Sequence, residues 1–195
     1  FADVLRLPFW FNPFWNLIFC SLCSDNKFDV VVIRDLPLLN LAVRHKNRYG
    51  FRVIYDMAEV YPEMYQSIRY FGKFKIKDFL LKSPRLAARY EAKTISGVDH
   101  TFTMIEESRD RLLANKVPPQ NVSIVSNTPL VSKYNYAVMK HKGAALRIVY
   151  VGNLTRLRGL DLLIKGVYEF IKRSKSQGDV KVDIVGTGQA LEGLH

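Results

Sequence analysis

Short runs of β-branched residues alternate with helical repeats along most of the 195-residue chain. Six such runs cover residues 29–33, 52–56, 99–103, 122–126, 146–151 and 180–185. Between most of them lie stretches with apolar side chains three and four positions apart, as in an amphipathic helix, at residues 36–48, 70–96, 106–114 and 160–174. Strands that alternate with helices are typical of parallel sheets with helices on both faces. We therefore expect an α/β fold.

Residues 129–145 interrupt this alternation, because they have no clear period and contain a polar, basic run at residues 140–143. We predict a first Rossmann-like domain at residues 1–130 that lacks its opening strands, and a linker at residues 131–145. Residues 146–195 would be the incomplete start of a second domain. The chain does not begin with Met and stops inside an expected helix, so we expect a fragment truncated at both ends.

Two glycine turns follow strands in the expected second domain. Gly152 ends one run, and Gly186 and Gly188 follow the next. A strand that stops at a glycine before a helix directs backbone N–H groups and the positive helix end to one point, which stabilises an anion. The second turn is not a dinucleotide-binding fingerprint, because Leu191 stands where that motif needs its third glycine. We interpret both turns as phosphate-binding.

The loop at residues 152–159 also carries Arg156 and Arg158, between a strand end and a helix start. Arginine offers fixed, always charged donors that suit phosphate oxygens. The alternative is that both are ordinary solvated charges. Their position after a strand-terminating glycine favours anion binding.

Polar side chains follow the strands of the expected first domain, where ligands of open α/β sheets bind. They are Arg34, Asp35, Asp56, Glu59, Glu107 and Asn127. Asp35, Asp56 and Glu59 could serve as general base, as ligand of an acceptor hydroxyl or as charge partner. The alternative is that Asp35 and Glu106 cap the helices that follow them.

The formal net charge of +11 favours an anionic partner such as nucleic acid, a phosphorylated substrate or an acidic membrane. Residues 69–93 interleave aromatic and leucine side chains with eight basic ones: Arg69, Lys73, Lys75, Lys77, Lys82, Arg85, Arg89 and Lys93. Such a stretch is typical of a helix on an anionic membrane, and an ordinary amphipathic helix is the alternative. No nucleic-acid recognition signature occurs, so we expect no nucleic-acid partner.

Cys20 and Cys23 form a lone Cys-x-x-Cys pair without the further ligands of a zinc site, and the four histidines show no metal-ligand spacing. We therefore expect reduced, structural thiols, a reducing compartment and no metal. The apolar stretch at residues 7–23 contains Pro8 and Pro13 and is short for a membrane span. It predicts a buried or interfacial helix.

The order of these stretches resembles the GT-B glycosyltransferases, in particular the large family 4 of retaining enzymes that use nucleotide diphosphate sugars. The likeness covers roughly residues 28–193. Its pieces are the strand at residues 28–35, the strand ends at 53–59, 98–108 and 122–127, the glycine loop at 148–159 and the turn at 182–188. Each piece is weak alone, but six in this order are fairly specific.

The resemblance implies two facing Rossmann-like domains, the first acceptor-binding and the second nucleotide-sugar-binding. The implied donor diphosphate site comprises Gly152, Asn153, Arg156, Arg158, Gly186 and Gly188, and the implied acceptor side comprises Arg34, Asp35, Glu107 and Asn127. Arg158 stands at the position of the family's lysine. No metal or other cofactor is implied, because positive side chains and a helix N-terminus neutralise the departing diphosphate.

Three departures from the family pattern affect the site. Asn153 stands where many relatives carry the first diphosphate-binding arginine, so Arg156 would supply that charge. Ala58 stands where many carry a histidine, which leaves Asp56 and Glu59 as the catalytic candidates. The paired glutamates that hold the donor sugar would lie beyond His195, so we expect this fragment alone to be inactive.

The sequence thus predicts a retaining glycosyltransferase of the hexosyltransferase type, which moves a sugar from a nucleotide diphosphate sugar to a hydroxyl acceptor. We expect it in polysaccharide, glycolipid or other glycoconjugate synthesis, with a lipid-linked acceptor. It would be cytoplasmic, with a peripheral contact to the inner face of the membrane. Two alternatives stay open: a sugar-nucleotide epimerase of the same fold, and a non-catalytic GT-B-like binding module, which Asn153 and Ala58 make credible.

Overall fold

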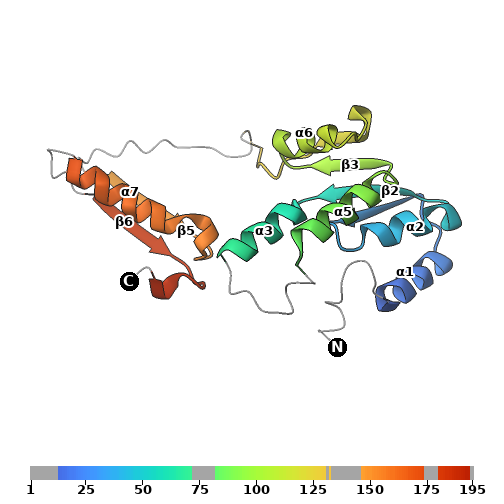
Figure 1. The fold of residues 1–195 in the computed structure, drawn as a ribbon, viewed down its shortest axis with the longest axis horizontal. Coiled ribbons are helices and arrows are strands. Elements are labelled where there is room, and N and C mark those ends of the chain that lie inside the picture. The colour runs from blue at the N-terminus through green and yellow to red at the C-terminus, as the bar shows by residue number, and fades with distance from the viewer. Residues whose placement is uncertain (1–12, 72–81, 131, 133–145, 174–179, 194–195) are drawn as a thin grey trace. The chain divides into compact units, whose positions relative to one another are not determined.

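The computed structural model describes residues 13–71, 82–130, 132, 146–173 and 180–193, in two compact units, Phe1–Pro129 and Leu130–His195 (Figure 1). The first unit contains α1 (Pro13–Asp25), β1 (Val30–Arg34), α2 (Leu39–Tyr49), β2 (Arg52–Met57), α3 (Tyr61–Phe71), α5 (Pro84–Ile95), β3 (His100–Thr103), α6 (Glu106–Ala114), η2 (Pro119–Asn121) and β4 (Val122–Ile124). The second contains β5 (Leu146–Val151), η4 (Arg156–Arg158), α7 (Leu160–Arg173), β6 (Val180–Val185) and η5 (Leu191–Gly193). Of the predicted linker, only Ser132 is among the described residues.

The first unit is built on a four-stranded parallel sheet with the order β1-β2-β3-β4. Ile33 lies beside Tyr55, Tyr55 beside Thr101, and Thr101 beside Val122. β-branched and aromatic side chains thus form continuous rows across the strands, which favours this pairing. The parallel sheet predicted from the alternation is confirmed.

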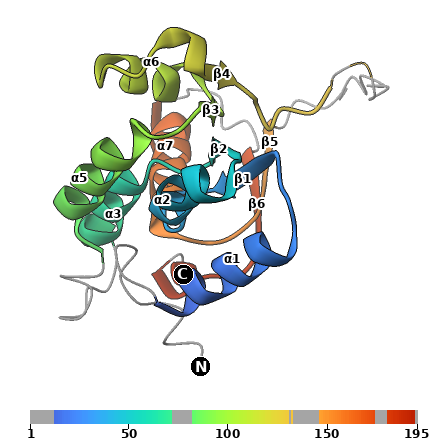
Figure 2. The ribbon, with the colours of Figure 1, turned by 90° about the vertical axis from the view of Figure 1, so that its right-hand side faces the viewer.

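The described helices of the first unit cover one face of the sheet (Figure 2). α2 packs on β1 and β2, α6 packs on β3 and β4, and α3 packs against α5. The expectation of helices on both faces is therefore wrong for the described part of this unit. Connections between parallel strands are right-handed. Because β1, β2, β3 and β4 follow one another across the sheet in chain order, every connecting helix lies on the same face.

Burial along the strands follows this one-sided cover. Val53, Tyr55 and Met57 on the helix-covered face of β2 are at most 2% exposed. On β1, Val30 and Val32 point to the other face and are 46% and 56% exposed. The core therefore lies between the sheet and the helices. Its most buried members are Leu36, Leu39, Ala42, Val53, Tyr55 and Ala87.

The helix expected over residues 70–96 is wrong as a single element. A new helix, α5, begins after Ser83, whose hydroxyl accepts the N–H of Leu86, and Pro84 takes the first helical position. The preceding helix α3 was not predicted. Of the residues between the two helices, 72–81 lie outside the described part of the chain and include the predicted membrane-contacting Lys73, Lys75 and Lys77.

The second unit pairs β5 with β6 in parallel, with the bounds that the sequence predicted, and α7 connects the two strands. Its described residues include two fully buried apolar side chains, Leu154 and Leu160, at 1% and 2% exposure. Valines on the sheet face away from α7 are largely exposed: Val149, Val151 and Val185.

Helix α1 is the helix predicted from the apolar N-terminal stretch, and it lies at the periphery of the first unit, outside α2 (Figures 1 and 2). The ring of Phe19 meets Phe51 edge-on at 5.9 Å. Both cysteines are free thiols, in agreement with the prediction, and burial raises the pKa of the Cys23 thiol. Among the described helices, none has the length and apolar character to cross a membrane.

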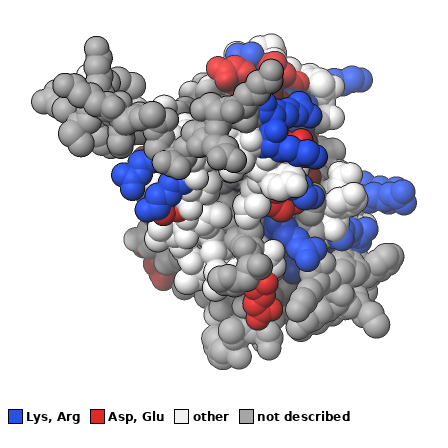
Figure 3. All heavy atoms as spheres, turned by 90° about the vertical axis from the view of Figure 1, so that its left-hand side faces the viewer, with Lys and Arg blue, Asp and Glu red and all other residues white. Residues whose placement is uncertain are grey.

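Charged side chains on the face drawn in Figure 3 form several groups, with acidic residues between basic ones. The described basic side chains on that face are therefore not gathered into one patch.

Candidate functional site

The glycine loop after β5 is held against the turn after β6 by backbone hydrogen bonds. The N–H of Gly152 donates to the Val185 carbonyl at 3.0 Å, and the N–H of Leu154 donates to the Thr187 carbonyl at 2.8 Å. The Leu154 carbonyl accepts the N–H of Ala190 at 3.0 Å. The two predicted phosphate-binding turns therefore form one connected structure within the second unit.

Gly186 and Gly188 are required for this close packing. Their φ angles of +152° and +156° favour glycine. A Cβ at Gly186 would overlap the carbonyl of Gly152, and a Cβ at Gly188 would overlap the carbonyl of Leu154 and the side chain of Asn153. Both glycines thus have a structural role, and their contact with phosphate stays a prediction.

Arg156 and Arg158 lie on the short 3₁₀ turn η4 that leads into α7. The N–H of Arg158 donates to Thr155 at 3.0 Å, and the N–H of Gly159, in a left-handed conformation, donates to Arg156 at 3.2 Å. Both arginine side chains are exposed, and no described acidic side chain forms an ion pair with either. Both guanidinium groups are thus available to an anion.

The ends of this arginine loop are the best-anchored positions described in the second unit. Leu154 precedes the loop and Leu160 follows it, and both side chains are fully buried. The first N–H groups of α7 have no intrahelical acceptor and face the same end as the arginines. Asp161 in the first turn offsets part of this positive potential, but two arginines outnumber it. The loop is therefore a positioned, net positive site.

In the first unit, the ends of β1 and β2 bring together four of the predicted residues. Arg34 Nη1 donates to Asp56 Oδ2 at 2.9 Å. Asp35 has a left-handed φ of +65°, its N–H donates to the Asp56 carbonyl at 3.0 Å, and its Oδ1 accepts the N–H of Glu59 at 3.2 Å. The capping interpretation of Asp35 is wrong, because Leu38 is the N-cap of α2 and the Asp35 carboxylate binds the next strand end instead.

Glu59 lies at the exposed rim of this group. Its carboxylate has no hydrogen bond or ion pair within the described part of the chain, whereas that of Asp56 is engaged by Arg34. Burial, followed by the charges of Asp35 and Glu59, raises the pKa of Tyr61 to about 12. The phenol therefore stays neutral beside the carboxylates, and Glu59 is the carboxylate most open to a ligand.

Glu107 and Asn127 lie at the ends of β3 and β4. Glu107 is exposed in the first turn of α6, and Asn127 Nδ2 donates to Met104 Sδ at 3.5 Å. No described hydrogen bond links either residue to Asp35 or Glu59. Glu106 does not cap α6, because Ile105 is the N-cap and no side-chain capping bond forms, so only its favourable charge near the helix start remains.

A buried polar group near the end of β2 was not predicted. Arg111 on α6 makes two 2.8 Å hydrogen bonds to Glu91 on α5, whose side chain is 5% exposed. The buried Tyr55 hydroxyl and Thr103 Oγ1 have no described partner nearby. Burial, then Glu91 and Asp35, raises the pKa of Tyr55 far above its ordinary value. No local sequence pattern links Glu91 with Arg111, since they lie on separate helices.

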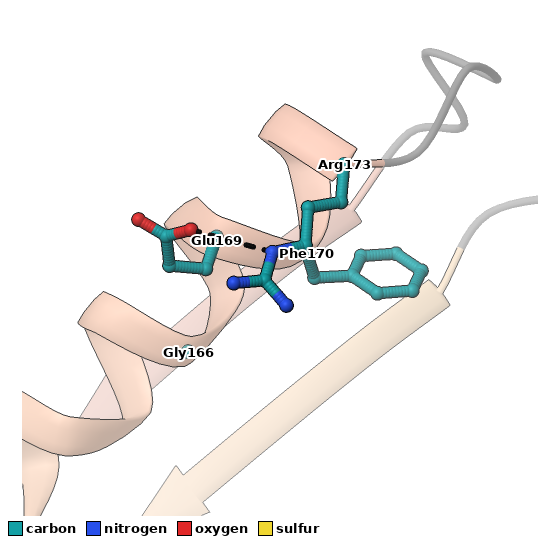
Figure 4. A pocket seen from close by; sticks show the side chains of 4 residues that line it. All are labelled: Gly166, Glu169, Phe170 and Arg173. Atoms are coloured by element: carbon teal, nitrogen blue, oxygen red, sulfur yellow. Dashed lines mark ion pairs between the residues drawn. The ribbon is translucent and has the colours of Figure 1, made fainter.

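A depression with a volume of about 470 Å³ lies on the carboxyl-terminal half of α7. Gly166, Glu169, Phe170 and Arg173 line it, and Glu169 and Arg173 form an exposed ion pair at 3.6 Å (Figure 4). A smaller apolar groove of about 260 Å³ lies between α7 and the strands. None of the predicted site residues lines either depression. Among the described residues, no group of three His, Cys, Asp or Glu side chains could hold a metal ion.

No protein-family model matches the chain, and no curated protein matches it. Two solved structures are similar in fold. The apo form of the lipopolysaccharide outer core galactosyltransferase WaaB matches with a TM-score of 0.52 at 16% identity, over 91% of this chain and 42% of WaaB. Anabaena HepE in complex with UDP and glucose matches with a TM-score of 0.55 at 11% identity, over 96% of this chain and 48% of HepE.

The chain thus spans less than half the length of either protein. Identities this low establish the fold alone. The chain has the mixed α/β fold with parallel sheets of the GT-B glycosyltransferases, as the sequence predicted.

Proposed function

We propose that this protein is a retaining glycosyltransferase of the family 4 type, which moves a hexose from a nucleotide diphosphate sugar to a hydroxyl acceptor. The GT-B fold and the binding of UDP and glucose by HepE support a nucleotide-sugar donor. Because the chain spans less than half of the solved structures, the proposal concerns the activity of the whole protein.

The observation that carries the proposal is the arginine loop of the second unit. It holds Arg156 and Arg158 exposed beside the positive end of α7, with buried leucines at both ends. Fixed guanidinium donors and a helix N-terminus stabilise the charge that develops on a departing diphosphate. We assign the donor diphosphate to Arg156, Arg158 and the backbone around Gly152, with Asn153, Gly186 and Gly188 shaping the loop, and no metal ion.

We assign the acceptor to the ends of the first-unit strands. Of the two catalytic candidates, Asp56 and Glu59, the better one is Glu59. Its carboxylate lacks a described partner, while that of Asp56 is paired with Arg34. Asp35 holds the backbone at Glu59 in place through its hydrogen bond. Glu107 and Asn127 would contact the acceptor from the neighbouring strand ends.

The test is a donor panel of UDP, GDP and ADP sugars, with transfer and donor hydrolysis measured by product analysis. Arg158→Ala should weaken donor binding roughly 10- to 100-fold, the loss expected for one charge-assisted hydrogen bond. Lys172→Ala, an exposed cation at the other end of α7, is the matched control and should leave the affinity unchanged. Unchanged affinity in Arg158→Ala would remove that residue from the site. The absence of both transfer and hydrolysis with every donor in the panel would refute the proposal.

A peripheral membrane contact of the basic stretch 69–93 belongs to the same proposal, with a lipid-linked acceptor met at the inner membrane face. Its described part supports the idea, because Arg85, Arg89 and Lys93 on α5 are exposed and four positions apart. They therefore form one basic stripe along the helix.

The first alternative, a non-catalytic binding module, is supported by Asn153 and Ala58, which depart from the family pattern. The structure gives Asn153 a packing role, since its side chain lies against Gly188. Donor binding without transfer or hydrolysis would favour this alternative. Release of an altered sugar nucleotide from donor alone would instead favour an epimerase of the same fold.

A further inference from the structure

Helix α1 carries both cysteines of the chain, in unequal surroundings. Cys20 is partly exposed, whereas Cys23 is 8% exposed and belongs to the hydrophobic core. The two residues are three positions apart, so both thiols lie on one face of the helix. A cysteine reacts only where a reagent can reach its sulfur, so Cys20 is the thiol that can meet a reagent from solution.

His45 on α2 provides Cys20 with a hydrogen-bond donor. His45 Nε2 lies 2.9 Å from Asn16 Oδ1 and 3.6 Å from Cys20 Sγ. Burial, followed by the charges of Arg48 and Arg44, lowers the pKa of His45, which favours the neutral ring with a single proton. Because the amide oxygen of Asn16 can only accept, Nε2 carries that proton and shares it with the sulfur. An N–H group beside a sulfur stabilises the thiolate, which is the reactive form of cysteine.

Cys23 lies near Cys20, but the last turn of α1 has to rearrange before the two sulfurs can bond. Side chains three positions apart in a helix have Cβ atoms about 5–6 Å apart, whereas a disulfide holds them about 3.5–4.5 Å apart. Two side chains bond to backbone carbonyls in this turn. The Ser24 hydroxyl donates to the Cys20 carbonyl at 2.8 Å. Asn26 Nδ2 donates to the Leu22 carbonyl at 3.1 Å. Such bonds compete with the helical backbone bonds, so this turn is the part of α1 that can rearrange.

We propose that Cys20 and Cys23 form a redox site, at which Cys20 exchanges with a small disulfide such as oxidised glutathione and Cys23 then closes a disulfide within α1. The Cys20 thiol gives its proton to water, and the thiolate attacks one sulfur of oxidised glutathione. This step breaks the glutathione disulfide, forms a mixed disulfide and releases one glutathione thiolate. The Cys23 thiol gives its proton to that thiolate and attacks the Cys20 sulfur, which releases the second glutathione to take up the proton from water. Two cysteine thiols are thereby oxidised to one disulfide, and one oxidised glutathione is reduced to two molecules of glutathione.

Oxidation loosens the contact between α1 and α2. A disulfide turns the Cys20 sulfur away from His45 and withdraws the Cys23 sulfur from the core. A bridge that has to rearrange a helical turn is reduced more easily than a structural disulfide. The pair therefore stays reduced in a reducing compartment and responds to a rise in oxidised glutathione. This site does not depend on any transfer activity of the protein.

The experiment is incubation of the reduced protein with oxidised glutathione, followed by blocking of free thiols with N-ethylmaleimide and mass spectrometry. We expect a form with neither free thiols nor bound glutathione, which dithiothreitol reverts. Cys23→Ala keeps a small apolar side chain in the core and should stop at the mixed disulfide on Cys20. Cys20→Ser is the matched control and should react at least about tenfold more slowly, because only the buried thiol remains. Hydrogen exchange of the oxidised protein should be faster in the last turn of α1 and unchanged in β2.

The part played by His45 is measured as the rate at which iodoacetamide alkylates Cys20 in the Cys23→Ala background at neutral pH. His45→Phe keeps a ring beside Phe19 and Tyr49 but lacks the donor. It should slow the alkylation about 2- to 10-fold, the effect of one hydrogen bond. His45→Gln supplies an amide donor and should recover most of the rate, which a purely structural role of the ring would not allow. Circular dichroism shows whether each variant keeps the fold.

Three outcomes would overturn the proposal. The first is that oxidised glutathione leaves both thiols of the parent protein free. The second is equal reaction of Cys20→Ser and Cys23→Ala, which would mean that exposure and His45 do not distinguish the two thiols. The third is a mixed disulfide that persists in the parent protein, or a disulfide between two chains, because Cys23 would then not close the bridge within α1.

Discussion

The buried ion pair between Arg111 and Glu91 gives a sharp test of how the first unit is held together. It joins α6 to α5 through two 2.8 Å hydrogen bonds, with side chains 23% and 5% exposed. Burial alone would lower the pKa of Arg111, but the bond to Glu91 raises it above its ordinary value, so the guanidinium keeps its charge. Arg111→Met keeps an unbranched apolar side chain of similar reach and leaves the Glu91 carboxylate buried without its cation.

We expect Arg111→Met to lower the free energy of unfolding by about 3–5 kcal/mol, the usual loss when one partner of a buried pair is removed. Adding Glu91→Leu should restore most of it, because an apolar pair does not pay the desolvation of two charges. Arg109→Met on the same helix is the matched control. Its ion pair with Asp110 has side chains 39% and 63% exposed, so the loss should be at most about 0.5 kcal/mol.

The assay is urea unfolding followed by tryptophan fluorescence. Both tryptophans lie in the first unit, so the signal does not report on the second unit. The single variant Glu91→Leu completes a double-mutant cycle, whose interaction energy isolates the pair. The reasoning is refuted if Arg111→Met and Arg109→Met cost the same, or if the double variant is as unstable as Arg111→Met alone.

Two further perturbations test local features. Gly186→Ala should destabilise the second unit, because its Cβ would overlap the Gly152 carbonyl. The loss in free energy of unfolding should be several times the ordinary difference of about 1 kcal/mol between glycine and alanine in a helix. Gly166→Ala in the open middle of α7 should instead stabilise the unit slightly, and limited proteolysis of both variants checks this. Burial would raise the pKa of Asp99, but a backbone N–H bond and the Lys46 ammonium hold it below its usual value. A carboxyl group whose pKa is lower in the folded state than in the unfolded state contributes stability above the unfolded pKa, and this stability is lost as pH falls. The urea midpoints of Asp99→Asn should therefore depend less on pH below about 4 than those of the parent. Equal slopes would contradict this.

The strands could be predicted because their signal is local. β5 and β6 have the bounds expected from their β-branched runs, since alternating Val, Ile and Tyr leave few other structures open. Helix α3 was missed although Tyr61, Met64, Tyr65 and Ile68 have helical spacing, a signal that would have found it. The merged helix over residues 70–96 failed for a different reason, because the Ser83–Pro84 start signal was overlooked.

The first-unit site could be placed but not resolved from the sequence. That Arg34, Asp35, Asp56 and Glu59 share one edge follows from parallel strands, whose carboxyl ends meet. Which carboxylate is paired does not follow, because the Arg34–Asp56 bond and the left-handed backbone of Asp35 depend on the register between β1 and β2. Because Arg34 pairs with the Asp56 carboxylate, Glu59 is the carboxylate that stays open to a ligand.

The sequence alone could not separate the two interpretations of the arginine loop of the second unit, because solvated arginines have no local signature that distinguishes them from ligand-binding ones. A purely solvated charge gains nothing from a fixed backbone. Here the described part of the second unit places its two fully buried leucines, Leu154 and Leu160, at the two ends of the loop that exposes Arg156 and Arg158. Backbone bonds to the β6 turn fix the loop further. Rigid support beneath unpaired charge reduces the entropy lost when an anion binds, which favours a ligand site over a solvated surface.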